Sequence, residues 1–310
     1  MLTLGFDTSN YATSLAVFDT QAGGVVCDTK QFLPVREGQL GLRQSDALFH
    51  HTVALPKLLE EIGSKVDLSK IEAVGVSAKP RPVEGSYMPC FLAGVSAATA
   101  FAAARNIPLI HTTHQQGHVS AALFASGRMD LFDSQSLVVH ISGGTTDLLL
   151  CDKMNTLTQL GTSSDLYAGQ AVDRLGVSLG FGFPAGVKVS ELAARCDEDI
   201  RPKASVKGMQ CSLSGLENQT KQLLEQGKSP EYVCKYCLLC VAETVVRMTK
   251  AACKEYPGLP VVCAGGVMSS QIVADYVRAR LPKVYFVPGK FSSDNAIGVS
   301  ILAAREAENG

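Results

Sequence analysis

The stretch LVVHISGGTTDLLL, residues 137–150, joins an apolar run to a second apolar run through a short polar turn that contains two glycines. This order predicts a buried strand, a hairpin turn and a returning strand. Roughly 135 residues earlier, residues 4–17 (LGFDTSNYATSLAV) follow the same pattern. Because strand–helix alternation follows each copy, the sequence indicates a weak internal duplication of an α/β unit.

A duplicated unit of this kind is typical of actin-like architectures, the group that also contains sugar kinases and heat-shock ATPases. We therefore predict an α/β, duplicated actin-like (ASKHA) two-domain fold with a ligand cleft between the halves. The chain has 310 residues, enough for two domains. We place the halves at residues 1–133 and 134–310, and we expect the final helix, from about Asn295, to pack back on the first half.

Composition narrows the function classes. Hydrophobic residues make up 46% and charged residues 18% of the chain, which excludes a disordered or coiled-coil protein. Trp is absent and aromatics are 6%, which disfavours a base-stacking platform. With 28 Lys and Arg against 29 Asp and Glu, the net charge is −1. A polyanionic partner would therefore need a local basic patch, for which Lys79, Arg81 and Arg174 are candidates.

The ten cysteines lie mostly in apolar runs, which indicates reduced, buried thiols. The spacing Cys234-x-x-Cys237-x-x-Cys240 resembles a cluster-binding pattern, but it falls inside a long apolar helix predicted over residues 232–252, so we interpret it as core packing. No basic leader and no long apolar run is present. We expect a cytoplasmic protein without a membrane segment.

Two glycine turns point to a nucleotide. The turn Ser142–Thr146 offers backbone N–H groups and hydroxyls to a phosphate or oxyanion, although a tight hairpin would also use glycine for a positive φ. The second turn, with Gly265 and Gly266, follows an apolar strand and precedes a helix, which would place open backbone beside an adenosine moiety. A plain βα turn is the alternative for this second segment.

A histidine pair points to a metal. If Thr113 caps a helix and Gln116 completes a capping box, His114 and His118 project from one helix face and can share an ion. Two polar residues at a partly exposed helix start are the alternative. Asp294 is the candidate third ligand, and two imidazoles with one carboxylate suit Zn²⁺ or Fe²⁺. The segment lacks the glutamate of metalloprotease helices, so peptidase activity is disfavoured.

Asp173, within a predicted helix, is a further candidate ligand-binding residue. Its carboxylate would accept a hydrogen bond from a ribose or substrate hydroxyl, or it would form a solvated edge with Arg174.

These pieces together resemble the TsaD-type family, the tRNA N(6)-adenosine threonylcarbamoyltransferases formerly called O-sialoglycoprotein endopeptidases. Seven motifs occur in the family's order over nearly the whole chain: residues 5–9 (GFDTS), His114 with His118, 142–146 (SGGTT), 169–174 (GQAVDR) with 183–186 (FPAG), 212–216 (SLSGL), 264–267 (AGGV) and 293–295 (SDN).

The resemblance implies transfer of a threonylcarbamoyl group from its adenylate to N6 of the adenosine beside the tRNA anticodon, with release of AMP. It implies a divalent metal, Fe²⁺ or Zn²⁺, on His114, His118 and Asp294, and it makes Asp7 a further candidate catalytic residue. The implied partners are tRNA, an adenine nucleotide or acyl-adenylate, and the protein subunits of a tRNA-modifying complex. The implied nucleotide-binding residues are His140, Ile141, Ser142, Gly143, Gly144, Asp173, Gly186, Gly265, Gly266 and Ser270.

Several positions depart from the family pattern. They are Tyr11-Ala12 for Asp-Glu, Lys79-Pro80-Arg81 for Gly-Pro-Gly, Thr145 for His, Gln170 for Glu, Glu217 for Lys and Ser270 for Asn. These changes lie on predicted ligand-facing loops, whereas the three predicted metal ligands are retained. They motivate an alternative function: a diverged, non-catalytic paralogue that binds nucleotide and metal and acts as a partner or sensor.

Overall fold

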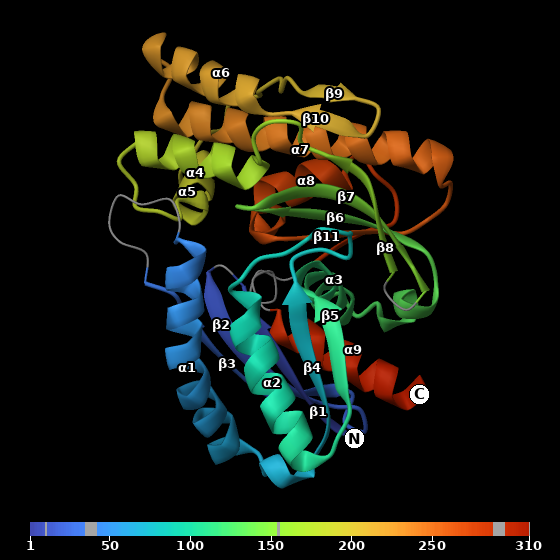
Figure 1. The fold of residues 1–310 in the computed structure, drawn as a ribbon. Helices are drawn as coiled ribbons and strands as arrows, with labels where there is room; N and C mark the ends of the chain where they lie inside the picture. The colour runs from blue at the N-terminus through green and yellow to red at the C-terminus, as the bar shows by residue number, and fades with distance from the viewer. Residues whose placement is uncertain (10, 35–41, 154–155, 288–294, 310) are drawn as a thin grey trace. The chain divides into compact units, whose positions relative to one another are not determined.

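The structure, a computed structural model, describes residues 1–9, 11–34, 42–153, 156–287 and 295–309 (Figure 1). The chain packs into two compact units, residues 1–124 with 294–310 and residues 125–293. The packing units and the predicted halves therefore divide the chain at different places: residues 125–133 group with the second unit, and the C-terminal helix groups with the first.

The first unit is built on a five-stranded mixed sheet in the order β3-β2-β1-β4-β5. β1, β2 and β3 form an antiparallel meander, and β4 and β5 continue the sheet in parallel. Almost every residue of β1 and β2 is buried, because helices cover both faces of these central strands. The bounds are β1 Leu2–Thr8, β2 Ala12–Asp19, β3 Gly24–Phe32, β4 Ile71–Lys79 and β5 Leu109–Thr113.

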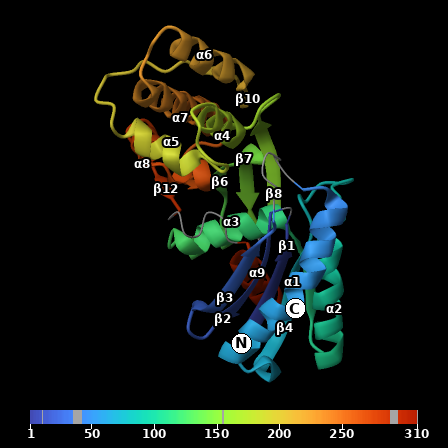
Figure 2. The same cartoon turned by 90° about the vertical axis from the view of Figure 1, so that its left-hand side faces the viewer.

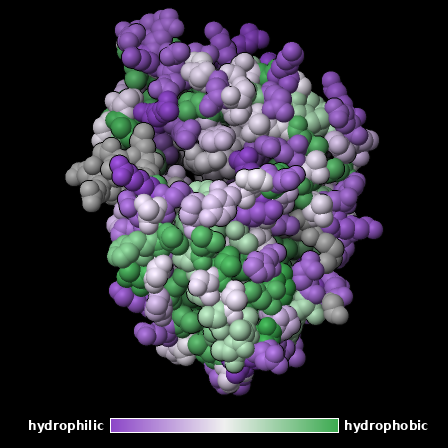
Figure 3. All heavy atoms as spheres, viewed as in Figure 1, coloured by the Kyte–Doolittle hydropathy of each residue, from purple (hydrophilic) through white to green (hydrophobic). Residues whose placement is uncertain are grey.

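Helices α1 (Gln44–Lys65) and α2 (Phe91–Arg105) cover one face of this sheet and contact each other (Figure 2). Their apolar sides join Leu4, Phe6 and Leu15 in the core of the unit. On their outer side, large apolar side chains are exposed at Phe49 and Leu92, and Figure 3 shows the resulting hydrophobic areas on this face. Helix α1 begins directly after Arg43, without a side-chain cap.

The opposite face of the first sheet is covered by α9 (Ala296–Asn309), which contacts all five strands. The approach is close because glycines line it: a Cβ at Gly75 would lie 2.6 Å from the carbonyl oxygen of Val299, and a Cβ at Gly5 would overlap that of Ala296. Gly5 and Gly75 are register partners on neighbouring strands. α3 (His114–Ala125) meets α9 in the same way, since a Cβ at Gly298 would overlap the carbonyl oxygen of Gly117.

The second unit repeats the sheet of the first. Its strands run in the order β8-β7-β6-β11-β12, with β6, β7 and β8 antiparallel and β11 and β12 parallel, which matches β3-β2-β1-β4-β5 strand for strand. This topology confirms the internal duplication predicted from the two copies of the strand–turn–strand pattern. The bounds are β6 Ser136–Ser142, β7 Thr145–Asp152, β8 Thr156–Thr162, β11 Val261–Ala264 and β12 Val284–Phe286.

The second unit differs from the first by an insertion between β8 and β11. It holds three helices and a small hairpin before the long helix α7, along which α6 packs in both views (Figures 1 and 2). The insertion consists of α4 Ala168–Ser178, α5 Gly186–Ala193, β9 Ser205–Lys207, β10 Gln210–Ser212, α6 Ser214–Glu225 and α7 Pro230–Glu255. Helix α8 (Gln271–Arg278) follows β11. Short 3₁₀ turns are η1 Leu68–Lys70 in the first unit and η2 Met129–Asp133 and η4 Gly266–Ser269 in the second.

Helix α7 confirms the interpretation of the cysteine repeat. Cys234, Cys237 and Cys240 are buried in the core of the second unit, and all three thiols are free. Burial raises the pKa of Cys234 to about 12, so this thiol stays protonated at neutral pH. Among the helices described, none is both long enough and apolar enough to cross a bilayer.

A buried histidine ties α1 to β2 in the first unit. His51 is fully buried, and its Nδ1 lies 2.7 Å from Oγ1 of Thr13. Burial lowers the pKa of His51, and this effect outweighs the opposite influence of the Ser9 backbone and the Asp7 carboxylate. The folded protein therefore holds His51 as a neutral ring.

The glycine contact between α3 and α9 predicts that alanine at position 298 destabilises the protein, the reverse of the usual effect of Gly→Ala in a helix. Alanine normally stabilises a helix relative to glycine by about 1 kcal/mol, but we expect Gly298→Ala to lower the free energy of unfolding by about 1–3 kcal/mol, because the new Cβ overlaps the Gly117 carbonyl. Gly63→Ala in α1 is the control, since the nearest atom there is a leucine side-chain carbon at 3.2 Å. Urea titration measures both, and a Gly298→Ala variant as stable as wild type would contradict the contact.

His51 predicts a pH dependence of stability. Its folded-state pKa is below the unfolded value of about 6.5, so protons bind the unfolded chain first and stability falls as the pH drops below about 6.5, by up to about 1.4 kcal/mol per pH unit. We expect His51→Asn to flatten this slope between pH 7.5 and 5.5 in urea titrations. Equal slopes in wild type and His51→Asn would contradict the assignment.

Candidate functional site

The first candidate cluster lies in the first unit and contains an aspartate, a histidine and an asparagine. Asp7 comes from the end of β1, His114 opens α3, and Asn295 precedes α9. The Oδ1 atom of Asp7 is 3.0 Å from Nδ1 of His114 and 3.2 Å from Nδ2 of Asn295. Asp7 and Asn295 are almost completely buried. The amide nitrogen of Asn295 also contacts Nδ1 of His114, whereas Oδ1 of Asn295 has no hydrogen-bond partner among the described residues.

The position of His114 follows from a local capping box. Oγ1 of Thr113 accepts the backbone N–H of Gln116 at 3.2 Å, and Oε1 of Gln116 accepts the backbone N–H of Thr113 at 3.0 Å. This confirms the predicted start of the helix. His118 follows one turn later on the same face, and the centroids of the two imidazole rings are 4.5 Å apart.

The electrostatics of Asp7 favour its charged form. Burial alone would raise the pKa of this carboxyl, but the adjacent imidazole of His114 and the amide of Asn295 outweigh burial and lower it below its usual range. Asp7 is therefore a buried carboxylate that faces His114.

These residues fit a divalent cation. Neighbouring imidazoles on one helix face are suitable nitrogen ligands, and metal-bound histidines usually hold their second ring nitrogen against a carboxylate, as Asp7 does here. Asp294, the predicted third ligand, lies outside the described residues. Within the described ranges, no three His, Cys, Asp or Glu side chains form a group that could hold a metal, so the triad stays a prediction.

The second candidate cluster lies in the second unit at the β6–β7 turn. Gly143 and Gly144 have no positive φ, and a Cβ on either would meet no atom within 4 Å. The alternative explanation for these two glycines, a tight hairpin that needs a positive φ, therefore does not hold. Gly169, in the first turn of α4, packs against the backbone of Ser142, which places a helix start beside this exposed turn.

The second glycine turn contains two glycines with different surroundings: the backbone requires one of them, and the other faces open space. Gly265 has φ +98° and its Cβ would overlap the carbonyl oxygen of Ile141, whereas Gly266 is exposed and a Cβ there would meet nothing. Ser270, just before α8, is buried, and its hydroxyl has no hydrogen-bond partner among the described residues. Gly266 and Gly143 thus leave open space around neighbouring strand ends of one sheet.

Two predicted nucleotide residues are buried in the second sheet. Ile141 belongs to the apolar core, so any contact with a ligand must come from its backbone. His140 is buried and lies opposite Asp147 in the β6–β7 register.

Asp173 is partly exposed and contacts the backbone before α5. Its Oδ1 accepts the backbone N–H of Ala185 at 2.8 Å, just before α5 begins at Gly186. Burial raises its pKa, and the backbone N–H groups of Ala185 and Gly186 only partly offset this effect. The predicted solvated edge with Arg174 is wrong, because Arg174 pairs with Glu217 at 2.7 Å instead.

Sequence reasoning missed Asp165. Its carboxylate accepts hydrogen bonds from Oγ of Ser212 at 2.6 Å, Oγ of Ser214 at 2.5 Å and the backbone N–H of Leu213 at 2.8 Å. Burial opposes ionisation, but these bonds outweigh it and lower the pKa well below its usual range. Asp165 therefore fastens the start of α6 to the segment before α4. The alternating serines 212 and 214 were the available signal.

Comparison with known proteins identifies the family. A family model described as tRNA N6-adenosine threonylcarbamoyltransferase matches residues 39–300. The chain belongs to this family. The threonylcarbamoyltransferase of Streptococcus pneumoniae (strain ATCC 700669 / Spain 23F-1) is 29% identical over 98% of this chain and 91% of its own. That of Enterococcus faecalis (strain ATCC 700802 / V583) is 30% identical over 84% of this chain and 77% of its own. These threonylcarbamoyltransferases are acyltransferases.

Solved structures confirm the actin-like ATPase fold. HypF from T. kodakarensis matches all of this chain and 48% of its own, with a TM-score of 0.65 and 11% identity. A ROK family glucokinase from Streptomyces griseus, solved with glucose and AMPPNP, covers 98% of this chain and 100% of its own with a TM-score of 0.56 and 12% identity. At such identities the likeness shows the fold alone.

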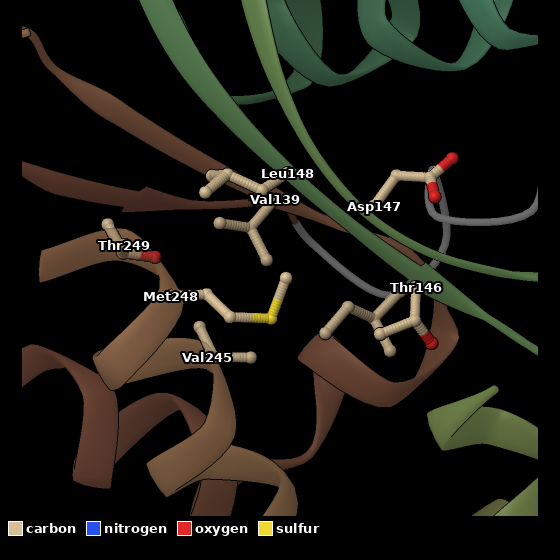
Figure 4. A pocket seen from close by; sticks show the side chains of 8 residues that line it. Val139, Thr146, Asp147, Leu148, Val245, Met248 and Thr249 are labelled. Carbon is tan, nitrogen blue, oxygen red and sulfur yellow. The ribbon is translucent and has the colours of Figure 1, made fainter. Parts of the chain in front are cut away.

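A small cavity in this threonylcarbamoyltransferase family member is not a ligand site. Its volume is about 10 Å³, room for one water, and it lies between the second sheet and α7, lined by residues such as Val139, Val245 and Met248. Figure 4 shows the Asp147 carboxylate pointing away from Val245 and Met248. The cavity is a packing gap.

Asp165 predicts a pH-dependent contribution to stability. Because its pKa is lower in the folded than in the unfolded state, where it is about 3.9, its stabilisation is complete above about pH 5 and is lost as the pH falls through the folded-state pKa. We expect Asp165→Asn to cost about 1–2 kcal/mol at pH 7 and progressively less below pH 4. Urea titration measures the difference; Asp199→Asn, an exposed carboxylate of the same unit, is the control, and a cost that grows at acid pH would contradict the assignment.

Proposed function

We propose that this protein transfers a threonylcarbamoyl group from threonylcarbamoyl-adenylate to N6 of the adenosine next to the tRNA anticodon. The observation that carries the proposal is the family match over residues 39–300, whose description names this activity. The proposal includes cytoplasmic action with protein partner subunits. The exposed Phe49 and Leu92 on α1 and α2 support the partner subunits, because exposed apolar patches often mark interfaces.

The reaction is an acyl transfer in which atoms balance without a further reagent. N6 of adenosine attacks the carbamoyl carbonyl carbon, the bond from that carbon to the phosphate oxygen breaks, AMP leaves, and N6 loses a proton. A divalent cation, Fe²⁺ or Zn²⁺, held by His114, His118 and Asp294, would supply Lewis-acid polarisation of the carbonyl. The Asp7 carboxylate, which contacts His114, orients that imidazole.

The second unit supplies the nucleotide contacts of the proposal. The exposed turn at Gly143 and Gly144 holds the adenylate phosphate through backbone N–H groups, since a Cβ on either glycine would meet no atom within 4 Å. The N–H of Gly144 donates to Oγ of Ser142 at 3.3 Å, so the phosphate would take the place of this hydroxyl. Asp173 keeps Gly186 at the start of α5, and Gly265, Gly266 and the Ser270 hydroxyl adjoin the nucleoside. His140 and Ile141 support the turn from β6.

The non-catalytic paralogue is not favoured, because the matched relatives carry the name of the enzyme. The decisive assay combines purified protein, metal, threonylcarbamoyl-adenylate and unmodified tRNA, with and without candidate partner subunits. Mass spectrometry of the digested tRNA should detect threonylcarbamoyladenosine. No modified nucleoside under any condition, together with intact metal binding, would exclude the transferase.

Metal content tests the ligand assignment. We expect His114→Ala and Asp294→Ala to lose the bound divalent metal and most transferase activity, because each removes one of the three proposed ligands. His111→Ala is the matched control, since this exposed histidine lies three residues upstream on β5. Elemental analysis after dialysis measures occupancy, and equal occupancy in all three variants would remove the proposed triad.

A further inference from the structure

Three large apolar side chains are exposed where α4 ends and α5 begins. Val177 is 47% exposed, Phe183 45% and Val187 71%. The two helices meet at this point, because a Cβ at Gly176 would overlap the Cβ of Ala185. Each of the three exposed residues is one or two positions away from this contact in the chain. They therefore surround a single contact between the helices, and we call them the α4–α5 patch.

Two cations flank this patch. Arg174 is three residues before the valine on α4, so both project from the same side of the helix, and Lys188 directly follows the valine on α5. Both cations are exposed. Arg174 pairs with Glu217 at 2.7 Å and Lys188 pairs with Glu191 at 2.8 Å. Exposed ion pairs of this kind are weak, so a phosphate can displace either carboxylate.

The patch lies along the helix that starts beside the turn proposed to hold the adenylate phosphate. Gly169, in the first turn of α4, packs against the backbone of Ser142. With a rise of 1.5 Å per residue, Arg174 lies about 8 Å and Val177 about 12 Å farther along the axis of α4. N6 of the acceptor adenosine has to reach the carbamoyl group of the adenylate. The nucleotides next to that adenosine therefore pass close to this helix.

The chemistry of the patch favours single-stranded RNA over a protein. Proteins bind unpaired bases by stacking them on aromatic rings, while cations nearby pair with the phosphates. The centre of a protein–protein interface is instead depleted of charged residues, whereas cations adjoin this patch on both helices. The bases of an anticodon loop are unpaired, which is the state that an exposed ring can bind.

We propose that the α4–α5 patch binds the anticodon loop of the substrate tRNA, with one unpaired base stacked on the ring of Phe183 and nearby phosphates paired with Arg174 and Lys188. The identity of this RNA rests on the proposed function. Stacking tolerates any base, because every base has a π face. Phe183 therefore contributes affinity and places the loop, and it does not select the base.

A fluorescent reporter tests the stacking directly. The chain contains no Trp, so Phe183→Trp introduces a single indole whose emission falls when a base stacks on it. We expect an unmodified anticodon stem-loop RNA to quench this emission, and a fully paired RNA duplex with the same number of phosphates to leave it nearly unchanged. Equal quenching by the two RNAs would overturn the proposal.

Phe32→Trp is the matched control for the reporter. Phe32 belongs to β3 of the first unit and is 67% exposed, and Nζ of Lys30 lies 5.3 Å from the centroid of its ring. It therefore offers an exposed ring beside a cation, as position 183 does. We expect the stem-loop to leave its emission nearly unchanged. Quenching as strong as in Phe183→Trp would overturn the proposal.

Affinity for the stem-loop separates a ring from apolar bulk. We expect Phe183→Ala to weaken binding about 5–100-fold and Phe183→Tyr to keep it near the wild-type value. Phe183→Leu, which is apolar but has no ring, should bind as weakly as the alanine variant. Urea titration checks that each variant is folded. Wild-type affinity in Phe183→Ala or Phe183→Leu, or no binding by the wild-type protein, would overturn the proposal.

Salt dependence tests the cation. We expect Arg174→Gln to weaken binding of the stem-loop and to reduce the slope of log affinity against log salt concentration by about 1. An unchanged slope would remove Arg174 from the proposed contact.

These assays contain no acyl donor, so they do not depend on catalysis. Absent transferase activity, with a stem-loop affinity that Phe183→Ala weakens, would overturn the proposed function alone. Transferase activity with an unchanged KM for tRNA in Phe183→Ala would overturn the present proposal alone.

Discussion

The close approach of α9 to the first sheet and to α3 is the constraint on which the first unit depends. Backbone meets backbone at Gly5, Gly75 and Gly298, where any side chain would overlap a carbonyl oxygen or crowd it. Such contacts fix a helix in rotation and translation more strictly than interdigitating side chains, because no rotamer can adjust to a shift. This packing also fixes the position of Asn295, the residue before α9. Asn295 contacts Asp7 and His114 only while α9 keeps its place on the sheet.

The duplicated topology lets each unit build a different kind of site at the same edge of its sheet. In the first unit, the end of β1 carries a carboxylate and the helix after β5 carries the histidine pair. In the second, the end of β6 carries the open turn at Gly143 and Gly144, supported by the start of α4. One architecture thus offers side-chain ligands in one copy and exposed backbone in the other, which suits a metal and a phosphate respectively.

A feature of this structure can be predicted from the sequence when the residues that determine it lie close together in the chain, and not when they lie far apart. The strand–turn–strand pattern of both units and the helix start after Thr113 follow from local patterns, since a hairpin joins neighbouring segments and a capping box spans only four residues. The role of Asn295 was not predictable, because its partner Asp7 lies 288 residues away. Likewise, Asp165 contacts serines 47 and 49 residues downstream, and a lone aspartate before a helix carries no signal of that pairing. For the glycines of the β6–β7 turn, the local sequence left two explanations open, a phosphate-binding turn and a hairpin that needs a positive φ, and the backbone does not require a positive φ.

The departures from the family pattern in the second unit, such as Glu217, also affect how a polyanion such as tRNA would bind. A chain with a net charge of −1 has no general attraction for tRNA, so each cation near the ligand turns matters. Arg174, one of the few candidates, lies 2.7 Å from Glu217, and both side chains are about half exposed. An exposed pair of this kind is worth little, about 1 kcal/mol or less, so a phosphate can displace Glu217 at small cost. The Glu217 carboxylate therefore reduces the non-specific attraction of Arg174 for polyanions. The Arg174 guanidinium can still pair with a phosphate that other contacts hold in place. Affinity for tRNA then has to come from several contacts made together rather than from the charge of this face alone.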